Sequence, residues 1–200
     1  MKKIDVPYDH EIIKELDNWR ESIDLELALI NSDSARHDYD STLDKEEIMK
    51  ELSKDYLIET IIPNENKHDF GKTNLVDLDI ASDSHKNVSD VFETHMQFDD
   101  MKFDRVSGAF WYPPNGYMGW HSNADHDAYR LYATWSEGGL NSFFRYRDPE
   151  TGAIITSWDK KGWTFRMFNC IAEQKVWHCV YSSGSRISLG FWYDRIPTSV

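Results

Sequence analysis

Residues 178–193 read His-Cys-Val-Tyr-Ser-Ser-Gly-Ser-Arg-Ile-Ser-Leu-Gly-Phe-Trp-Tyr, and this stretch decides the fold class. Polar and apolar side chains alternate from Arg186 to Leu189, which is typical of a strand with one face on a core. The turn Ser182-Ser183-Gly184 separates this run from the apolar residues before it. The pattern therefore predicts two β-strands joined by a short polar turn.

The same period of two continues through the second half of the chain. We expect seven strands, at 106–112, 129–135, 142–147, 153–157, 164–169, 175–181 and 186–193. Short strands at even spacing, separated by polar turns, indicate a sandwich or barrel rather than an α/β sheet. The sequence contains no GxGxxG, P-loop, HExxH or GxSxG motif and no internal repeat.

The first half has a different composition, rich in Asp, Glu, Lys and Ser. Apolar residues recur at helical spacing in 12–30 and again in 44–57, and we expect these helices to cover the barrel with their apolar faces. The polar stretch 63–87 is expected to be a long loop of the kind that can carry a lid. The prediction is a mainly β, α+β chain in which a helical and loop extension at 1–100 packs on a core at 101–200, forming one compact domain.

Composition excludes several functions. The chain has 200 residues, 40% of them hydrophobic, which is enough for a core. A net charge of -13 without a basic stretch argues against binding to nucleic-acid phosphates. The two cysteines, Cys170 and Cys179, form no CxxC pair and favour a reducing compartment. The N-terminus has no apolar segment typical of a signal peptide, and no run of 18 apolar residues is present, so we expect a cytoplasmic protein without a membrane span.

Four residues near the predicted strands carry chemistry. His178 follows His121 by 57 residues, and Arg186 and Ser188 come shortly afterwards. Residues two apart on a strand point to the same face, so Arg186 and Ser188 share one side. An Arg beside a hydroxyl is suited to clamp a carboxylate, and two imidazoles with an oxygen ligand suit non-haem Fe(II).

These residues stand in segments that resemble a known family. Residues 111–121, Trp-Tyr-Pro-Pro-Asn-Gly-Tyr-Met-Gly-Trp-His, resemble the Tyr-x-Pro-Gly…His-x-Asp segment of prolyl-hydroxylase-type iron(II)/2-oxoglutarate oxygenases. Residues 178–193 resemble that family's ending, His-x-Val…Gly-x-Arg-x-Ser…Trp-Phe/Tyr, and the segments 130–134 and 138–143 match it loosely. The resemblance covers roughly 106–193 and implies a double-stranded β-helix (jelly-roll) core.

The resemblance also implies roles for these residues. His121 and His178 would bind iron, Arg186 and Ser188 would hold the distal carboxylate of 2-oxoglutarate, and Tyr112 would hydrogen-bond the cosubstrate. The implied reaction hydroxylates a peptidyl side chain or a small molecule and releases succinate and CO2, with ascorbate as a candidate reductant.

Two further residues have open interpretations. Arg130 is a substrate contact by the resemblance, or else part of a salt bridge at a strand edge. Trp120 either shapes the mouth of the substrate site or packs in an aromatic core.

One position departs from the family. Its third iron ligand is an Asp or Glu two residues after the first His, and here that position is Asn123. Three arrangements are open: Asn123 ligates through its amide oxygen, Asp125 (less so Asp127) replaces it, or the position is left to water or an anion, as in related halogenases. A halogenase-like oxygenase and a non-catalytic binding module are therefore the alternatives, although the retained Arg-x-Ser pair argues against the module.

Overall fold

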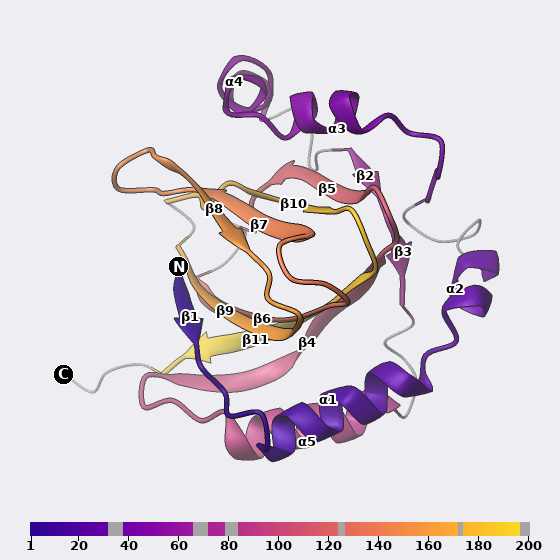
Figure 1. Ribbon diagram of the computed structural model, residues 1–200. Helices are drawn as coiled ribbons and strands as arrows, with labels where there is room; N and C mark the ends of the chain where they lie inside the picture. The colour runs from indigo at the N-terminus through magenta and orange to yellow at the C-terminus, as the bar shows by residue number, and fades with distance from the viewer. Residues whose placement is uncertain (32–37, 66–71, 79–83, 124–126, 172–173, 197–200) are drawn as a thin grey trace.

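Eight strands in the second half of the chain form two facing antiparallel sheets (Figure 1). The computed structural model describes residues 1–31, 38–65, 72–78, 84–123, 127–171 and 174–196. The eight strands are β4 (Met101–Tyr112), β5 (Gly116–His121), β6 (Ala128–Ser136), β7 (Ser142–Arg147), β8 (Ile154–Trp158), β9 (Gly162–Cys170), β10 (His178–Ser182) and β11 (Arg186–Arg195).

The strand order defines the fold. Sheet A runs β1-β9-β6-β11-β4-β3 and sheet B runs β2-β5-β10-β7-β8. From β4 to β11 the chain crosses between the sheets at every step except the β7–β8 hairpin, which is the arrangement of a jelly roll. The predicted class, a mainly β double-stranded β-helix with supporting helices, is confirmed.

All seven predicted strands are present, and β7 has the predicted ends. The eighth, β5, escapes the pattern because both of its faces are covered, so its residues do not alternate in polarity. Three short strands, β1 (Lys2–Ile4), β2 (Thr73–Asn74) and β3 (Val76–Asp77), also join the sheets. Both sheets therefore include strands from before residue 100, the position at which composition divides the chain.

The prediction of a long loop at 63–87 is wrong for the described residues of this range. They hold β2, β3 and the start of helix α5 (Ser84–His95), which no pattern in the sequence predicted. Leu75 and Val76 are fully buried there, but strands of two residues are too short to show a period.

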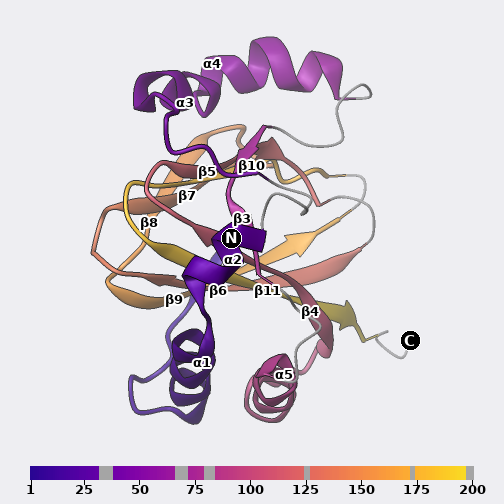
Figure 2. The same ribbon diagram turned by 90° about the vertical axis from the view of Figure 1, so that its right-hand side faces the viewer.

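Helices cover both sheets on their outer sides (Figure 2). Helix α1 (Glu11–Ser22) packs with α5 on sheet A, whereas α3 (Lys45–Glu51), α4 (Lys54–Tyr56), η2 (Leu57–Ile61) and η3 (Ile62–Asn64) lie on the side of sheet B. The side chain of Asp44 caps α3 by accepting hydrogen bonds from the backbone of Glu46 and Glu47. The predicted helices therefore cover the barrel, on opposite sheets.

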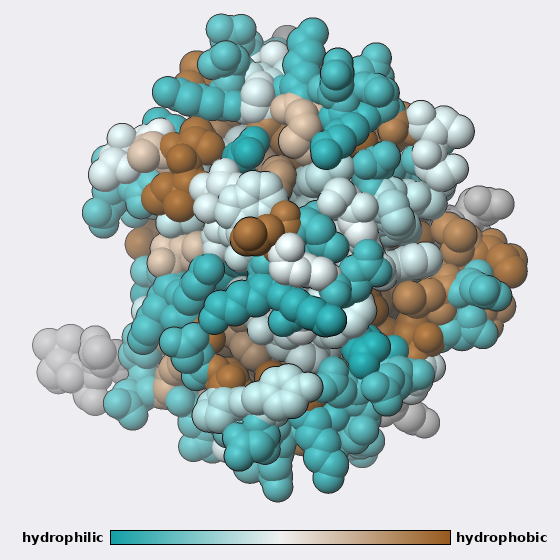
Figure 3. All heavy atoms as spheres, viewed as in Figure 1, coloured by the Kyte–Doolittle hydropathy of each residue, from teal (hydrophilic) through white to brown (hydrophobic). Residues whose placement is uncertain are grey.

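The predicted helix at 12–30 is interrupted at Ile23, whose extended backbone ends α1. Helix α2 (Leu25–Asn31) follows and leaves Leu27 and Ile30 exposed. Figure 3 shows an apolar patch where α2 lies, beside a surface that is otherwise mostly polar. None of the helices in the described ranges has the length and apolar composition that a membrane crossing requires.

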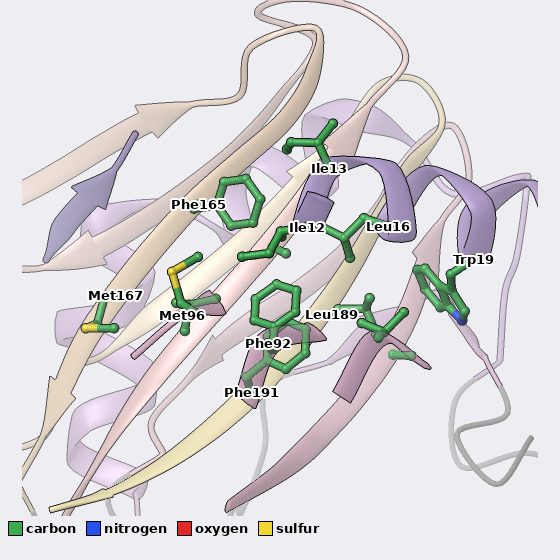
Figure 4. Close-up of a cluster of buried hydrophobic side chains, with 14 of the residues drawn as sticks. Ile12, Ile13, Leu16, Trp19, Phe92, Met96, Phe165, Met167, Leu189 and Phe191 are labelled. Carbon is green, nitrogen blue, oxygen red and sulfur yellow. The ribbon is translucent and has the colours of Figure 1, made fainter. Parts of the chain in front are cut away.

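The largest apolar cluster lies between sheet A and the helices α1 and α5 (Figure 4). Leu189 and Phe191 of β11 point into it from the sheet, and Leu16 and Phe92 point into it from the helices. The rings of Phe92 and Phe191 stack with centroids 3.8 Å apart. This layer uses the outer face of sheet A, so the inner face is left for the space between the sheets.

Candidate active site

A cavity of about 180 Å³ lies between the inner faces of the two sheets. Among the described residues that line it, two are arginines and none carries a carboxylate, although the whole chain has a net charge of -13. The described lining therefore has cationic side chains but no anionic one. The predicted site residues that line it are Tyr112, His121, Asn123, Arg130, His178, Arg186 and Ser188.

The two histidines come from neighbouring strands of sheet B. His121 ends β5, His178 begins β10, and the antiparallel register places the two residues directly opposite each other. Their ring centroids are 4.0 Å apart, and both side chains are buried. Closure of the barrel thus brings together two residues that stand 57 positions apart in the sequence.

Backbone carbonyls fix the orientation of both rings. His121 Nδ1 lies 2.8 Å from the carbonyl oxygen of Gly119, and His178 Nδ1 lies 2.9 Å from that of Val176. A carbonyl oxygen only accepts hydrogen bonds, so Nδ1 carries a proton in each ring, and Nε2 carries the lone pair when the ring is neutral. Metal-binding imidazoles commonly donate their second N–H to a carbonyl in this way.

Burial also keeps His178 neutral. Desolvation, followed by the neighbouring His121 ring, lowers the pKa of His178 well below its usual value, against a smaller opposing effect of the Val176 carbonyl. A neutral imidazole is the form that binds a metal ion.

Asn123 is the third polar group at this end of the cavity. Its Nδ2 donates to the Tyr132 hydroxyl at 2.7 Å and lies 3.4 Å from His178 Nε2. An amide side chain therefore stands next to the imidazole pair, but its role as a ligand stays a prediction.

Of the two carboxylates predicted as replacements, only Asp127 belongs to the described residues, and it does not line the cavity. Asp125 lies outside the described residues, and Asp127 is at an exposed bend before β6. Within the described ranges, no group of three His, Cys, Asp or Glu residues is placed to hold a metal ion.

Sheet A forms one wall of the cavity, and Arg186 lies in this wall and is 1% exposed. Its Nε donates to Asp159 Oδ2 at 3.0 Å, and its Nη2 donates to Thr134 Oγ1 at 3.2 Å. Its Nη1 is buried without a hydrogen-bond partner of good geometry in the described part of the chain. The N–H groups of this nitrogen are among the donors that remain for Tyr112 and for a molecule in the cavity.

Tyr112 and Ser188 flank this guanidinium, and we call the three residues the clamp. Tyr112 stands opposite Arg186 in the β4–β11 register, and the guanidinium carbon lies 4.8 Å from the centre of its ring. Burial raises the pKa of Tyr112 to about 12, although the charge of Arg186 and a side-chain hydrogen bond with it act in the other direction. The phenol therefore stays protonated, and together with the Ser188 hydroxyl it adds hydrogen-bonding capacity beside Arg186.

Two buried residues that were not singled out from the sequence hold Arg186 in place. Asp159 follows β8, and besides Arg186 its carboxylate accepts a hydrogen bond from Ser142 Oγ at 2.6 Å. Arg166 of β9 lies with its Nη1 2.6 Å from Asp159 Oδ1. In the sequence Asp159 precedes Lys160-Lys161-Gly162, a segment typical of a surface turn, so nothing there indicates a buried carboxylate. Only the position of Arg166 in the alternation of its strand indicates that this side chain points inward.

The two predicted substrate contacts differ in position. Arg130 lines the cavity, and its guanidinium lies 3.6 Å from the centre of the Trp192 ring. Trp120 is 1% exposed on the other face of sheet B, where it donates from Nε1 to the Ser53 carbonyl at 3.0 Å. The structure therefore does not bring Trp120 to the cavity, because its neighbour His121 takes the inward direction on β5.

No protein-family model matches the chain, and no curated protein matches it. Among solved structures, it is similar to an oxidoreductase of the 2OG-Fe(II) oxygenase family from Burkholderia pseudomallei, with 13% identity and a TM-score of 0.42. That alignment covers 62% of this chain and 66% of the other, so the chain spans just under two thirds of that protein's length.

Two other kinds of solved structure are similar. A Pseudomonas putida prolyl-4-hydroxylase has 12% identity and a TM-score of 0.37, with 73% of this chain and 90% of that chain covered. A Drosophila melanogaster CENP-C cupin domain has 10% identity and a TM-score of 0.33, with 76% and 99% covered. Because these identities and TM-scores are low, function has to be inferred from the residues of the cavity.

Proposed function

We propose that this protein is an iron(II)/2-oxoglutarate-dependent oxygenase that hydroxylates a peptidyl side chain or a small molecule. One observation carries the proposal: a buried pair of imidazoles and a buried guanidinium line the same small cavity. The first is suited to a metal ion and the second to a carboxylate.

The imidazole pair would supply two of the three protein ligands of a divalent iron ion. His121 and His178 are oriented through Nδ1 by carbonyls, which leaves Nε2 as the ligating atom in each ring. Asn123 would be the third ligand through its amide oxygen, which requires its side chain to turn because Nδ2 now lies nearest to His178 Nε2. When bound, iron would allow dioxygen to react with 2-oxoglutarate and the substrate, so that one oxygen atom goes to succinate, the other to the hydroxylated product, and CO2 is released.

The chain's own residues perform the other tasks. Arg186 binds the distal carboxylate of 2-oxoglutarate through Nη1, with the other two residues of the clamp beside it. The apolar rings of Phe144 and Phe168 pack against His178 and exclude water from that side, with the Phe144 ring centre 5.1 Å from that of the imidazole. Arg130, at the cavity wall, is placed to contact the substrate.

The test measures succinate release with iron(II), 2-oxoglutarate and ascorbate, in wild type and in His178→Ala. We expect release above background in the wild type only. Because uncoupled turnover is slow when the substrate is absent, calorimetric binding of 2-oxoglutarate in the presence of iron(II) is measured as well. Equal background release and equal binding in both proteins would contradict the proposal.

Asn123 favours a second candidate, a variant oxygenase such as a halogenase. In such an enzyme an anion takes the position that a carboxylate otherwise holds, and an amide next to His178 is compatible with this. Chloride should then change the absorption spectrum of the protein with iron(II) and 2-oxoglutarate, and Asn123→Asp should abolish the change. A spectrum that is the same with and without chloride would exclude the candidate.

A further inference from the structure

Three charged side chains, which we call the charged cluster, meet in the interior beside the cavity. Arg166, Asp159 and Arg186 are 0%, 1% and 1% exposed. Asp159 lies between the two guanidiniums, 2.6 Å from Arg166 Nη1 and 3.0 Å from Arg186 Nε. The charged cluster contains two positive charges and one negative charge, so its net charge is +1.

All three groups are ionised in this arrangement. Burial raises the pKa of Asp159, but the charges of Arg186 and Arg166 and the hydrogen bond from Ser142 lower it further, and the net shift is downward. Burial lowers the pKa of Arg166, against the raising effect of Asp159. A guanidinium nevertheless stays protonated in proteins because its ordinary pKa is above about 12.

The two arginines differ in what they face. Arg166 donates from Nε to Ser157 Oγ at 3.1 Å and from Nη2 to the carbonyls of Ser157 and Trp158. It is not among the described residues that line the cavity. Arg186 lines the cavity, and its Nη1 has no described partner of good geometry. The excess positive charge of the charged cluster therefore faces the cavity through Arg186.

An uncompensated buried charge is strongly unfavourable, and a charge-assisted hydrogen bond to an anion removes that penalty. No described residue that lines the cavity supplies a carboxylate. One carboxylate from a ligand would bring the net charge of the cluster and ligand to zero, whereas a neutral ligand would leave the +1 charge in place.

We infer that Arg166 and Asp159 set the charge of the clamp, so that the cavity binds one carboxylate group through Arg186 even without a metal ion. Arg166 is then a positioning residue that acts on the ligand through Asp159. The inference rests on the proposed function only for the identity of the ligand as 2-oxoglutarate; the charge and the contacts that require an anion belong to the chain itself.

Pentanoate and pentanamide test the inference, because they have nearly the same shape and differ in charge. Both are added to chelator-treated wild-type protein at constant ionic strength, and thermal unfolding and calorimetric binding are recorded. We expect pentanoate to bind and to raise the melting temperature, and pentanamide to do neither. The same response to both ligands, or to neither, would overturn the inference.

Variants of Arg166 test the role of the remote charge. Arg166→Met should weaken pentanoate binding at least tenfold although this residue does not line the cavity, and Arg166→Lys should recover part of the loss. Arg145→Met is the matched control, because it removes a guanidinium that bonds Thr156 and the Leu52 carbonyl on sheet B instead. The pentanoate affinity of Arg145→Met should stay within about twofold of wild type, because Arg145 belongs to the outer face of sheet B and does not line the cavity.

A failure of this inference can be distinguished from a failure of the proposed function. Wild-type affinity in folded Arg166→Met would overturn the inference, whatever the result of the succinate assay. Charge-dependent pentanoate binding, together with succinate release and 2-oxoglutarate binding that are equal in wild type and His178→Ala, would keep the inference and contradict the oxygenase. If circular dichroism shows that Arg166→Met does not fold, Arg166→Gln takes its place, because it is also neutral but keeps a donor for the Ser157 carbonyl. Wild-type affinity in Arg166→Gln would equally overturn the inference.

Discussion

The two faces of sheet A are both buried, but they are built by opposite rules. On β11, Leu189 and Phe191 point outward into hydrocarbon contributed by α1 and α5, whereas Arg186 and Ser188 point inward to the cavity. The outer layer needs volume and apolar surface, which many side chains supply. The inner layer needs a specific partner for each charge and donor. Stability should therefore depend mainly on the outer face and ligand selectivity mainly on the inner face.

The largest effect is expected from a void in the outer layer. Phe92 is fully buried and stacks on Phe191, so Phe92→Ala should lower the free energy of unfolding by roughly 3–5 kcal/mol. Urea titration followed by tryptophan fluorescence measures the loss. In the fraction that stays folded, pentanoate affinity should match wild type; a weakened affinity would show that the two faces are not independent.

A somewhat smaller loss is expected from the inner layer. Asp159→Asn leaves Arg166 and Arg186 without their shared carboxylate, and breaking a buried ion pair costs about 3 kcal/mol. The same urea titration measures it. Unlike Phe92→Ala, this variant should regain stability when pentanoate is added, and a variant with wild-type stability would show that the charged cluster is not a structural requirement.

The pH dependence of unfolding should separate the faces further. The two arginines lower the pKa of Asp159 in the folded state, so its contribution is fully present above the ordinary pKa of 3.8 and is lost as the pH falls through the folded-state pKa. The stability difference between wild type and Asp159→Asn should therefore shrink below about pH 4, while the difference between wild type and Phe92→Ala should not change. Thermal unfolding at several pH values provides the measurement. A constant difference for Asp159→Asn would contradict the assignment of a charged carboxylate.

The smallest effect is expected on the outer face of sheet B. Trp120→Phe removes the hydrogen bond to the Ser53 carbonyl and part of a buried ring, which should cost about 1–2 kcal/mol. Pentanoate affinity should not change, because Trp120 points away from the cavity. A change in pentanoate affinity of more than about twofold would indicate that the packing of Trp120 on β5 affects its neighbour His121.

Features that depend on local pattern could be predicted from the sequence. Polarity alternates from Phe144 to Arg147 of strand β7, and the sequence predicts both ends of this strand. His121, His178 and Arg186 were singled out because they stand in recognisable segments, and the three do line one cavity, although their roles as ligands stay predictions. Strand β5 was not located, since a strand covered on both faces loses its alternation.

Pairings between distant segments could not be predicted. Asp159 and Arg166 belong to a turn and to a strand whose inward side chains meet Arg186 only when the barrel closes. The same holds for Tyr132 and Asn123, whose contact depends on how the chain returns from sheet B to sheet A. A polarity pattern states which face a residue takes, but it does not state the partner.

The position of β11 has a consequence for how the chain is made. It is the last of the described strands in sequence, yet it lies in the middle of sheet A between β4 and β6. During synthesis, sheet A has a gap at its centre until residues 186–195 leave the ribosome. The neighbours of β11 in the sheet, β4 and β6, are made much earlier and have unpaired edges until then. Formation of the cavity is then a late, long-range event, and the protein is expected to fold slowly for its size.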